Sequence, residues 1–364
     1  MAARRPRYGG TLRVEIQAVV TSLDPAVAAA NPQEATAKSQ IDALIYPSRN
    51  TDGSFAGTPG SGAFRVDSFD PGKRLVLAAN TAAPGGRPFV DDIEILMGRA
   101  AQDRLVDLEL GKTDFAEIPC EESRKAAGAG VRLSVSQPDE LLAVVFLAGR
   151  PAAQDAHVRE ALAQTIDRAA IVNFILQKSG EPAGGLLPQW ASGTAFLFST
   201  AGDPAAAKEL WPQIPGSPRL VLGYDSGDPL QQSVAERIVV NAREAGMSWT
   251  AQPVISTGGA PASADVDARL MRWRMSSGSA RAALANFIQA LSPVAGIDSS
   301  AIADSGGAEA VYQREREIVA SYQVIPLVHL PQVYGLSAQV RDWKAPGPGE
   351  SWPLAGVWLE ESAP

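Results

Sequence analysis

The sequence contains few of the residues that build disulfide frameworks and metal sites. A single cysteine, Cys120, excludes an intramolecular disulfide and a thiolate-rich metal centre. The two histidines, His157 and His329, are too few for a histidine metal cluster. We therefore expect neither a metal ion nor another cofactor.

Long hydrophobic runs and an excess of positive charge are also missing. The longest apolar run, at residues 141–148, is far shorter than the roughly 20 residues of a membrane-spanning helix, so we expect no transmembrane segment. The 32 Lys and Arg residues are outnumbered by 40 Asp and Glu residues, which gives a net charge of −8. Because nucleic-acid binding needs clustered basic residues, we expect no nucleic-acid partner.

Catalytic motifs are absent as well. The glycine-rich stretch at residues 57–62 has no following lysine and precedes a predicted strand, so it does not form a phosphate-binding loop. No G-x-S-x-G nucleophile elbow occurs. A hydrolase could use only Cys120 and His157, and Cys120 lies among three glutamates that disfavour its thiolate. These absences favour a non-catalytic protein.

The length of 364 residues fits two domains at roughly 150 residues each. A hydrophobic content of 45% with 20% charged residues is typical of globular proteins and excludes wholesale disorder. Residues 1–8 are expected to form a flexible tail. They carry basic residues but no apolar segment, so we expect no signal peptide in this chain; the alternative interpretation of these residues is a mature or recombinant start.

Strands and short helices alternate in the first part of the chain. Asn31, Pro32 and Glu34 are typical of a helix N-terminus, with a cap, a first-turn proline and a capping-box acid. The predicted elements are strands at 11–17, 92–97, 113–119, 131–137 and 141–147, helices at 32–46 and 100–111, and a hairpin at 63–80.

Helices dominate the second part of the chain. Four aspartates occupy positions where N-caps belong: Asp155, Asp167, Asp203 and Asp228. A strand, a helix and a second strand at 219–254 form a βαβ unit, which predicts a mainly parallel sheet. A strand at 324–330 is apolar throughout and is expected to be buried on both faces.

The segment 269–278 combines an apolar and a basic face. Alternation along a strand places Met271, Trp273 and Met275 on one face and Arg272, Arg274 and Ser276 on the other. An arginine face near a loop can hold an anion, but an edge strand with solvated arginines would show the same pattern. His329 also leaves two interpretations, a hydrogen-bonded core histidine or a side chain that faces a cleft.

Several motifs, in the same order, resemble the family 5 extracellular solute-binding proteins of peptide/nickel-type ABC transporters. The segment RYGGTLRVEI with Ser22-Leu23-Asp24-Pro25 is similar to the N-terminal strand and turn of that family. GSGAFRV followed by FDPGKRLVLAAN resembles the family's "GTGPY" hairpin, and GGRPFVD its "GGRPYLD" step. LGKTDFAEIP, SGDPLQQSVAERIVVNAREAGM and VIPLVHLPQVYGLSAQVRDW continue the likeness. The strongest match is the segment at 155–188, which resembles "D-x-RVRQALSYAIDREAIV…G-x-G-x-PA…P".

This resemblance implies an α/β, two-lobed periplasmic-binding-protein-like fold (type II, cluster C-like) with a hinge and an interlobe cleft. Lobe I would comprise 9–147 and 324–364, and lobe II 148–323, with the strands 141–147 and 324–330 as the crossings. The implied function is non-catalytic binding of a small-molecule or peptide-like solute for the membrane permease of an ABC importer. The implied location is periplasmic or extracytoplasmic, and we expect a monomer.

Two departures from the family pattern bear on the ligand. The subdomain that normally precedes the "GTGPY" hairpin is expected to be absent, because about fifteen loop residues join the helix ending in IDALIY to GSGAFRV. Ser276 also stands where peptide-binding relatives place an aspartate for the peptide ammonium. Loss of that charge partner would cost about 2–5 kcal/mol of binding for a free amine. A neutral or anionic solute is then favoured.

The resemblance and the strand pattern together nominate ligand-binding residues. Lobe II would contribute Arg272, Trp273, Arg274, Ser276 and Ser277, and Asp24 and His329 would lie across the hinge. The alternative hypothesis is a degenerate binding fold that has lost its transport ligand and acts as a protein-interaction or scaffold module.

Overall fold

The structure is a computed structural model, and it describes residues 5–30, 32–49, 55–56, 60–192, 198–255, 265–300, 302 and 307–360. The chain forms two compact units. Unit 1 comprises residues 1–136, 332–346 and 350–364, and unit 2 comprises residues 137–331 and 347–349. Each unit contains its own mixed sheet.

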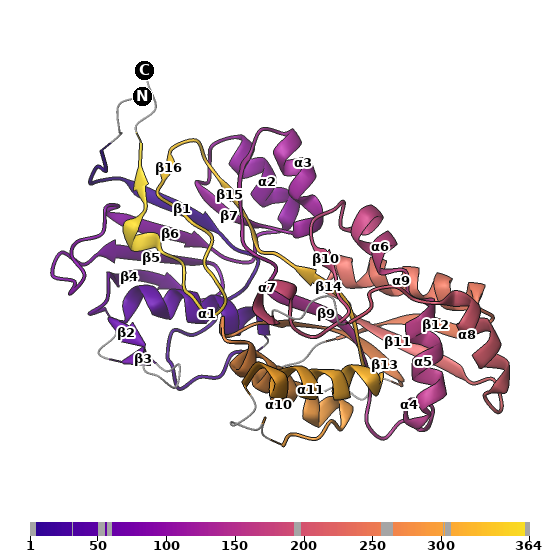
Figure 1. Cartoon of the computed structure of the whole chain (residues 1–364). Helices are drawn as coiled ribbons and strands as arrows, with labels where there is room; N and C mark the ends of the chain where they lie inside the picture. Colours follow the sequence, from indigo (N-terminus) through magenta and orange to yellow (C-terminus); the bar gives the residue numbers. More distant parts are fainter. Residues whose placement is uncertain are drawn as a thin grey trace. The chain divides into compact units, whose positions relative to one another are not determined.

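The sheet of unit 1 contains β1 (Thr11–Glu15), β4 (Phe64–Asp70), β5 (Arg74–Ala79), β6 (Asp92–Leu96), β7 (Phe115–Ile118), β8 (Arg132–Val135) and β15 (Val333–Leu336). Among the described residues these seven strands follow the order β4-β5-β6-β1-β7-β15-β8 (Figure 1). The strand β1 runs parallel to β6 and β7, and the other neighbours are antiparallel. The predicted hairpin at 63–80 is confirmed as β4 and β5.

Helices and short hairpins complete unit 1. They are α1 (Pro32–Ile45), α2 (Ala101–Glu109), α3 (Ser123–Gly128), β2 (Ser48–Arg49), β3 (Phe55–Ala56), β16 (Val340–Arg341) and β17 (Trp358–Leu359). The carboxylate of Glu34 accepts hydrogen bonds from the backbone amides of Thr21 (2.9 Å) and Ala30 (2.7 Å), so it holds the segment that precedes α1. The predicted cap Asn31 lies outside the described residues.

Alternating residues of β1 build the core of unit 1. Leu12 and Val14 are fully buried, as are Ile93 and Ile95 on the neighbouring β6. An aromatic cluster lies beside them, in which Phe115 meets the rings of Tyr334, Trp343 and Trp352 at centroid distances of 5.4, 4.6 and 5.6 Å. At the start of the described chain, the ring of Tyr8 lies 5.1 Å from that of Phe89.

The sheet of unit 2 contains β9 (Glu140–Phe146), β10 (Glu181–Pro182), β11 (Arg219–Asp225), β12 (Ser248–Val254), β13 (Ala268–Arg274) and β14 (Val324–Leu330). The order among the described residues is β10-β14-β9-β13-β11-β12. The predicted βαβ unit is confirmed, because β11 and β12 are parallel neighbours. The prediction of a mainly parallel sheet is wrong, because β9 and β14 enter as antiparallel central strands.

The helices of unit 2 are α4 (Pro151–Gln154), α5 (Ala156–Thr165), α6 (Arg168–Ala170), α7 (Gln189–Ser192), α8 (Pro204–Leu210), α9 (Pro229–Glu244), α10 (Ala280–Ala295) and α11 (Gly307–Ala320). All four predicted N-cap aspartates accept hydrogen bonds from backbone amides in the first turn of their helices. The helix after Asp167 is not a regular α-helix throughout, because α6 passes into a π-helical turn at Ile171–Ile175.

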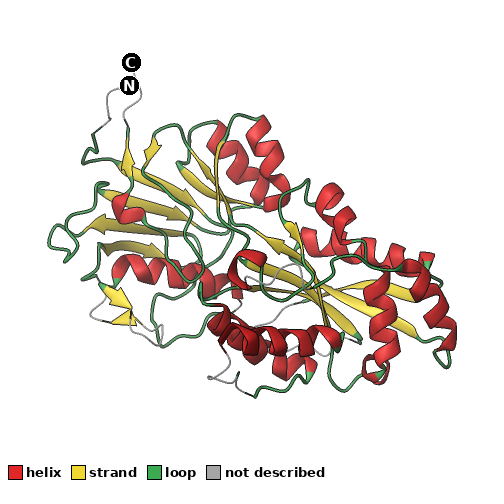
Figure 2. Ribbon diagram, in the orientation of Figure 1, coloured by secondary structure: helices red, strands yellow, loops and turns green. Residues whose placement is uncertain are grey.

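Helices cover both faces of this sheet (Figure 2). On β9, Leu141, Ala143 and Val145 point into a core that is shared with α10 and α11. The opposite face packs against α9, and there the ring of Phe146 meets that of Trp249 edge-on, with 6.1 Å between centroids. In the described part of the chain, no helix is both long and apolar enough to span a membrane.

The boundaries of the two units differ from the predicted lobes. Sequence analysis placed the strands 141–147 and 324–330 in lobe I, as crossings. In the structure β9 pairs with β13 on one side and β14 on the other, so both strands belong to the sheet of unit 2. Hydrophobicity predicted that these strands are buried, but it carried no information about their partners.

Candidate functional site

The strand β13 has the predicted two faces. Met271 and Trp273 pack against the core that α10 and α11 cover, and Met275, just after the strand, is buried there. Arg272 points to the opposite face, toward the N-terminus of α9. The alternation predicted from the sequence is therefore confirmed.

Arg272 is held by two carboxylates. Its Nε and Nη2 donate to Oε1 and Oε2 of Glu140, each at 2.9 Å, and its Nη1 donates to Oδ2 of Asp228, also at 2.9 Å. Burial alone would lower the pKa of Arg272, but Glu140 and Asp228 raise it well above its ordinary value. Two negative charges thus neutralise the guanidinium, and an anion would have to displace them. Arg272 is therefore not an unpaired cation, although its side chain is 30% exposed, and its assignment to the ligand face stays a prediction.

Asp228 connects this ion pair to the surrounding backbone. Its Oδ1 accepts from the amides of Leu230 (3.0 Å) and Gln231 (3.2 Å) and caps α9. The side chain of Gln231 donates to Asp228 Oδ2 at 3.2 Å and accepts from the amide of Asp225, the last residue of β11, at 3.0 Å. One network therefore fixes the carboxyl ends of the parallel strands β11 and β13, the edge at which open α/β sheets bind ligands.

Arg274 lies near a buried acid. Its Nε is 3.7 Å from Oδ2 of Asp139, whose pKa is raised to about 7 by burial, although Arg274 opposes this shift. The backbone of Asp139 is also fixed, because its amide donates to Leu330 O at 3.0 Å and its carbonyl accepts from Met275 N at 2.8 Å. Like Arg272, Arg274 is thus engaged with an acid of its own unit.

Ser276 and Ser277 follow β13 and begin the turn into α10. Asn286 donates from Nδ2 to the hydroxyl of Ser276, and the hydroxyl of Ser277 accepts from Ser279 N at 3.1 Å. Gly349 lies directly against this turn. A Cβ at Gly349 would come within 2.1 Å of the Ser276 carbonyl oxygen, and its φ of +75° also favours glycine.

His329 is a core residue. It is 4% exposed, and its Nε2 lies 3.2 Å from the carbonyl oxygen of Leu186. Burial lowers its pKa to about 4, so the imidazole is neutral at physiological pH. On the sheet, His329 and Trp273 flank Leu141 from opposite sides. The cleft-facing interpretation is wrong, and the core interpretation is confirmed.

Asp24 is an exposed turn residue of unit 1. Its Oδ1 accepts from Ala26 N at 2.9 Å, and its amide donates to the hydroxyl of Ser22 at 3.1 Å. The structure therefore assigns it a local turn-forming contact. Among the described residues, no three or more His, Cys, Asp or Glu side chains are placed to hold a metal ion.

The sequence profile of the family described as "Bacterial extracellular solute-binding proteins, family 5 Middle" matches residues 11–291. The chain belongs to this family. Family 5 proteins are the non-catalytic solute-binding proteins of peptide and nickel ABC transporters, and they act in the periplasm or outside the cell.

Two curated relatives match parts of the chain. It is 28% identical over 185 residues to the probable D,D-dipeptide-binding periplasmic protein DdpA of Escherichia coli K12, covering 49% of this chain and 35% of that protein. It is 28% identical over 127 residues to the oligopeptide-binding protein AppA of Bacillus subtilis, covering 34% and 23%. The matched part of the chain thus spans about a third or less of these relatives.

Solved structures show the same fold. The substrate-binding protein CtaP of Listeria monocytogenes aligns with a TM-score of 0.76 at 15% identity, over 98% of this chain and 100% of that one. DppA of Helicobacter pylori, in complex with the peptide STSA, aligns with a TM-score of 0.74 at 12% identity, over 98% and 99%. The predicted α/β, periplasmic-binding-protein-like fold is confirmed, and the structure adds that it contains two mixed sheets.

Sequence reasoning missed three acids of this family 5 protein. Glu140 and Asp228 neutralise Arg272, and Glu315 is fully buried in α11, where its Oε1 accepts from Leu187 N at 2.8 Å. Asp228 was recognised only as an N-cap. Glu315 stands in the charged run QRERE, which is typical of a solvated face, and only its helical spacing from Val311 and Ile318 could have indicated burial.

Proposed function

We propose that this protein is the non-catalytic solute-binding component of a peptide-family ABC importer. It binds a small peptide-like solute outside the cytoplasm, in a cleft between two lobes as the family resemblance implies, and delivers it to a membrane permease. The observation that carries the proposal is the family 5 match over residues 11–291, and the fold of peptide-binding relatives supports it. We also propose that the chain is a shortened form without the subdomain before β4.

The chemistry around β13 narrows the ligand. Arg272 and its two acids carry one positive and two negative charges, so this edge of the sheet offers no surplus positive charge to an anion. Ser276 supplies a hydroxyl where peptide-binding relatives have an aspartate for the ligand ammonium. We therefore revise the sequence-based preference and propose a neutral ligand, such as a peptide that is blocked at both its amino and its carboxyl end.

Thermal unfolding with matched ligands tests this proposal. We expect an N-acetylated dipeptide amide, which is uncharged, to stabilise the protein more than the same dipeptide amide with a free amine. The variant Ser276→Asp should reverse that order, because the new carboxylate pairs with the ammonium. Ser248→Asp adds the same charge at the exposed start of β12 and should keep the wild-type order. An unchanged order in Ser276→Asp would refute the assignment of Ser276.

The second candidate is a scaffold that has lost its ligand. It is favoured by the pairing of Arg272 with two acids of its own unit and by the burial of His329. This candidate predicts no stabilisation by any free or blocked peptide or by nickel-histidine complexes. Saturable stabilisation by one of them would exclude it.

A further inference from the structure

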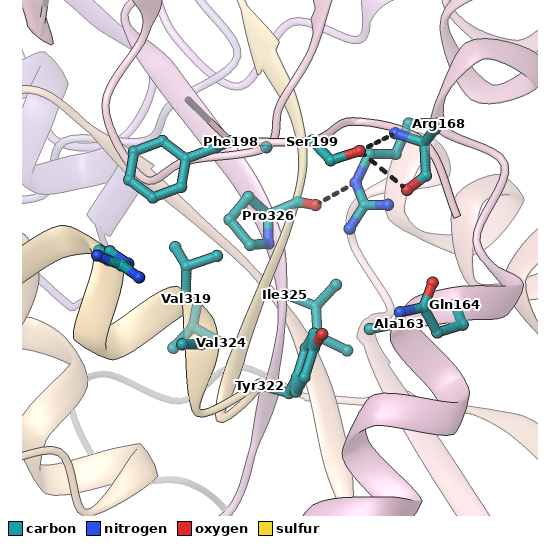
Figure 3. Close-up of a pocket in the computed structure, with 14 residues that line it drawn as sticks. Ala163, Gln164, Arg168, Phe198, Ser199, Val319, Tyr322, Val324, Ile325 and Pro326 are labelled. Carbon is teal, nitrogen blue, oxygen red and sulfur yellow. Dashed lines mark hydrogen bonds between the residues drawn. The ribbon is translucent and has the colours of Figure 1, made fainter. Parts of the chain in front are cut away.

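Unit 2 contains a pocket on the side of β14 toward α5 and the C-terminal end of α11. Its volume is about 220 Å³, and its walls come from Ala163 and Gln164 of α5, Val319 and Ala320 of α11, and Ile325 and Pro326 of β14 (Figure 3). A cavity of roughly 150 Å³ accommodates benzene in another protein. This pocket is therefore large enough for an aromatic ring that carries one small polar group.

Arg168 places a buried positive charge in the wall of this pocket. The residue is 6% exposed, its Nε donates to the carbonyl oxygen of Pro326 at 2.7 Å, and its Nη1 lies 3.5 Å from Thr200 O. Figure 3 shows its guanidinium directed between Pro326 and Gln164. Burial lowers its pKa to about 10, which leaves it charged at neutral pH.

This charge has no carboxylate partner within the described ranges of the chain. Arg168 contacts carbonyl oxygens. The titratable group that affects its pKa is the phenol of Tyr322. Burial raises the pKa of Tyr322, so the phenol is uncharged at neutral pH. Because a buried charge costs free energy unless it is paired, an anion that enters the pocket would gain a desolvated partner.

The remaining walls define the rest of the ligand. Phe198, Val319, Ile325 and Pro326 contribute apolar surface, and the exposed Arg316 adds a second positive charge to the lining. The negative charge of Glu160 raises the pKa of Tyr322, but it does not contribute to the shifted pKa of Arg168. The lining thus combines one buried cation with apolar surface in a pocket that is open on one side.

We propose that this pocket is a second binding site, distinct from the solute site of the family, which takes a small organic carboxylate with an apolar body. The carboxylate pairs with Arg168, and the apolar body lies against Val319, Ile325 and Pro326. This proposal does not depend on the proposed transport function, because every residue of the pocket belongs to unit 2.

Titration of the full chain with benzoate, benzamide and inorganic phosphate, followed by NMR and calorimetry, tests the site. We expect saturable binding of benzoate. Benzamide and phosphate should each bind at least about tenfold more weakly, because benzamide lacks the negative charge and phosphate lacks the apolar body. Phosphate binding as tight as that of benzoate, or equal binding of benzamide, would overturn the proposal. No benzoate binding up to its solubility limit would also overturn it.

Variants separate this site from a structural role of Arg168. Arg168→Gln should weaken benzoate binding by at least about tenfold, and so should Ala320→Phe, which fills the pocket from its exposed rim and leaves Arg168 in place. Arg159→Gln is the matched control, because Arg159 is also buried and donates to a carbonyl, that of Ser321 at 2.9 Å, outside the pocket. Undiminished binding in Ala320→Phe would refute the location. Peptide stabilisation should survive in Ala320→Phe, so the two proposals fail independently.

Discussion

Arg272 of β13 and Asp228, the N-cap of α9, are joined by a hydrogen bond of 2.9 Å from Nη1 to Oδ2 across 44 residues of chain. The same aspartate caps α9 through its other oxygen, and the same arginine forms a bidentate pair with Glu140 of β9. Two strands and a helix therefore share one charge network at the edge of the sheet of unit 2. This network replaces the open arginine face that the sequence suggested.

Replacement of Arg272 should destabilise unit 2. In Arg272→Met the carboxylates of Glu140 and Asp228 lose their common partner and remain close together, and we expect a loss of about 2–4 kcal/mol in the free energy of unfolding. Arg150→Gln is the control, because it breaks a pair with the exposed Asp265 and should cost less than about 1 kcal/mol. Urea denaturation measures both. Equal losses in the two variants would contradict the account of the network.

Glu315 should make the stability of unit 2 depend on pH. Burial raises the pKa of its carboxyl from 4.5 to about 7. The folded state therefore binds the proton more tightly, so this contribution to stability is fully present below pH 4.5 and is lost as the pH rises through 7. Glu315→Gln removes this dependence. Between pH 5 and 8 the free energy of unfolding of wild type should therefore fall by at most about 3 kcal/mol relative to that of the variant.

Two comparisons make the Glu315 experiment specific. Glu317→Gln changes an exposed acid on the same helix and should leave the pH dependence of wild type unaltered. His329 should change the stability with pH in the opposite direction. Its imidazole contacts Leu186 O, next to the amide of Leu187 that Glu315 binds. Because burial lowers its pKa from 6.5 to about 4, its contribution is present above pH 6.5 and is lost as the pH falls through 4. A pH profile of Glu315→Gln parallel to that of wild type would show that Glu315 is ionised in the folded protein.

Gly349 should be intolerant of a side chain. A Cβ there would lie 2.1 Å from Ser276 O, so Gly349→Ala must displace one of the two backbones, in addition to the strain of a positive φ. We expect faster amide hydrogen exchange around Ser276–Ser279 and a lower unfolding midpoint. Gly278→Ala, where a Cβ would meet no atom within 4 Å, is the control. Unchanged exchange in Gly349→Ala would show that this contact does not hold the turn.

Local signals in the sequence predicted local structure well. The N-caps Asp155, Asp167, Asp203 and Asp228 bind amides within three residues, so the sequence around each aspartate was sufficient to identify it. Alternation along β13 likewise assigned Met271 and Arg272 to opposite faces. Each of these predictions depended on spacing within a single element.

Contacts between distant segments could not be predicted in the same way. Glu140 precedes its partner Arg272 by 132 residues, and its role depends on the register between β9 and β13, which no local pattern encodes. The same lack of pairing information placed β9 and β14 in the wrong lobe. For His329, hydrophobicity showed a buried strand but could not decide between a core contact and a cleft. The carbonyl of Leu186 settles that choice in the structure.

Native mass spectrometry tests the central claim most directly. The protein is purified for it without denaturation, from the extracytoplasmic fraction of an expression host. The account predicts one small peptide-like solute per chain, released on collisional activation to leave the mass of the bare chain. Addition of an N-acetylated dipeptide amide should displace this solute. A bare chain before and after addition of free and blocked peptides would contradict the claim that this family 5 protein binds a solute.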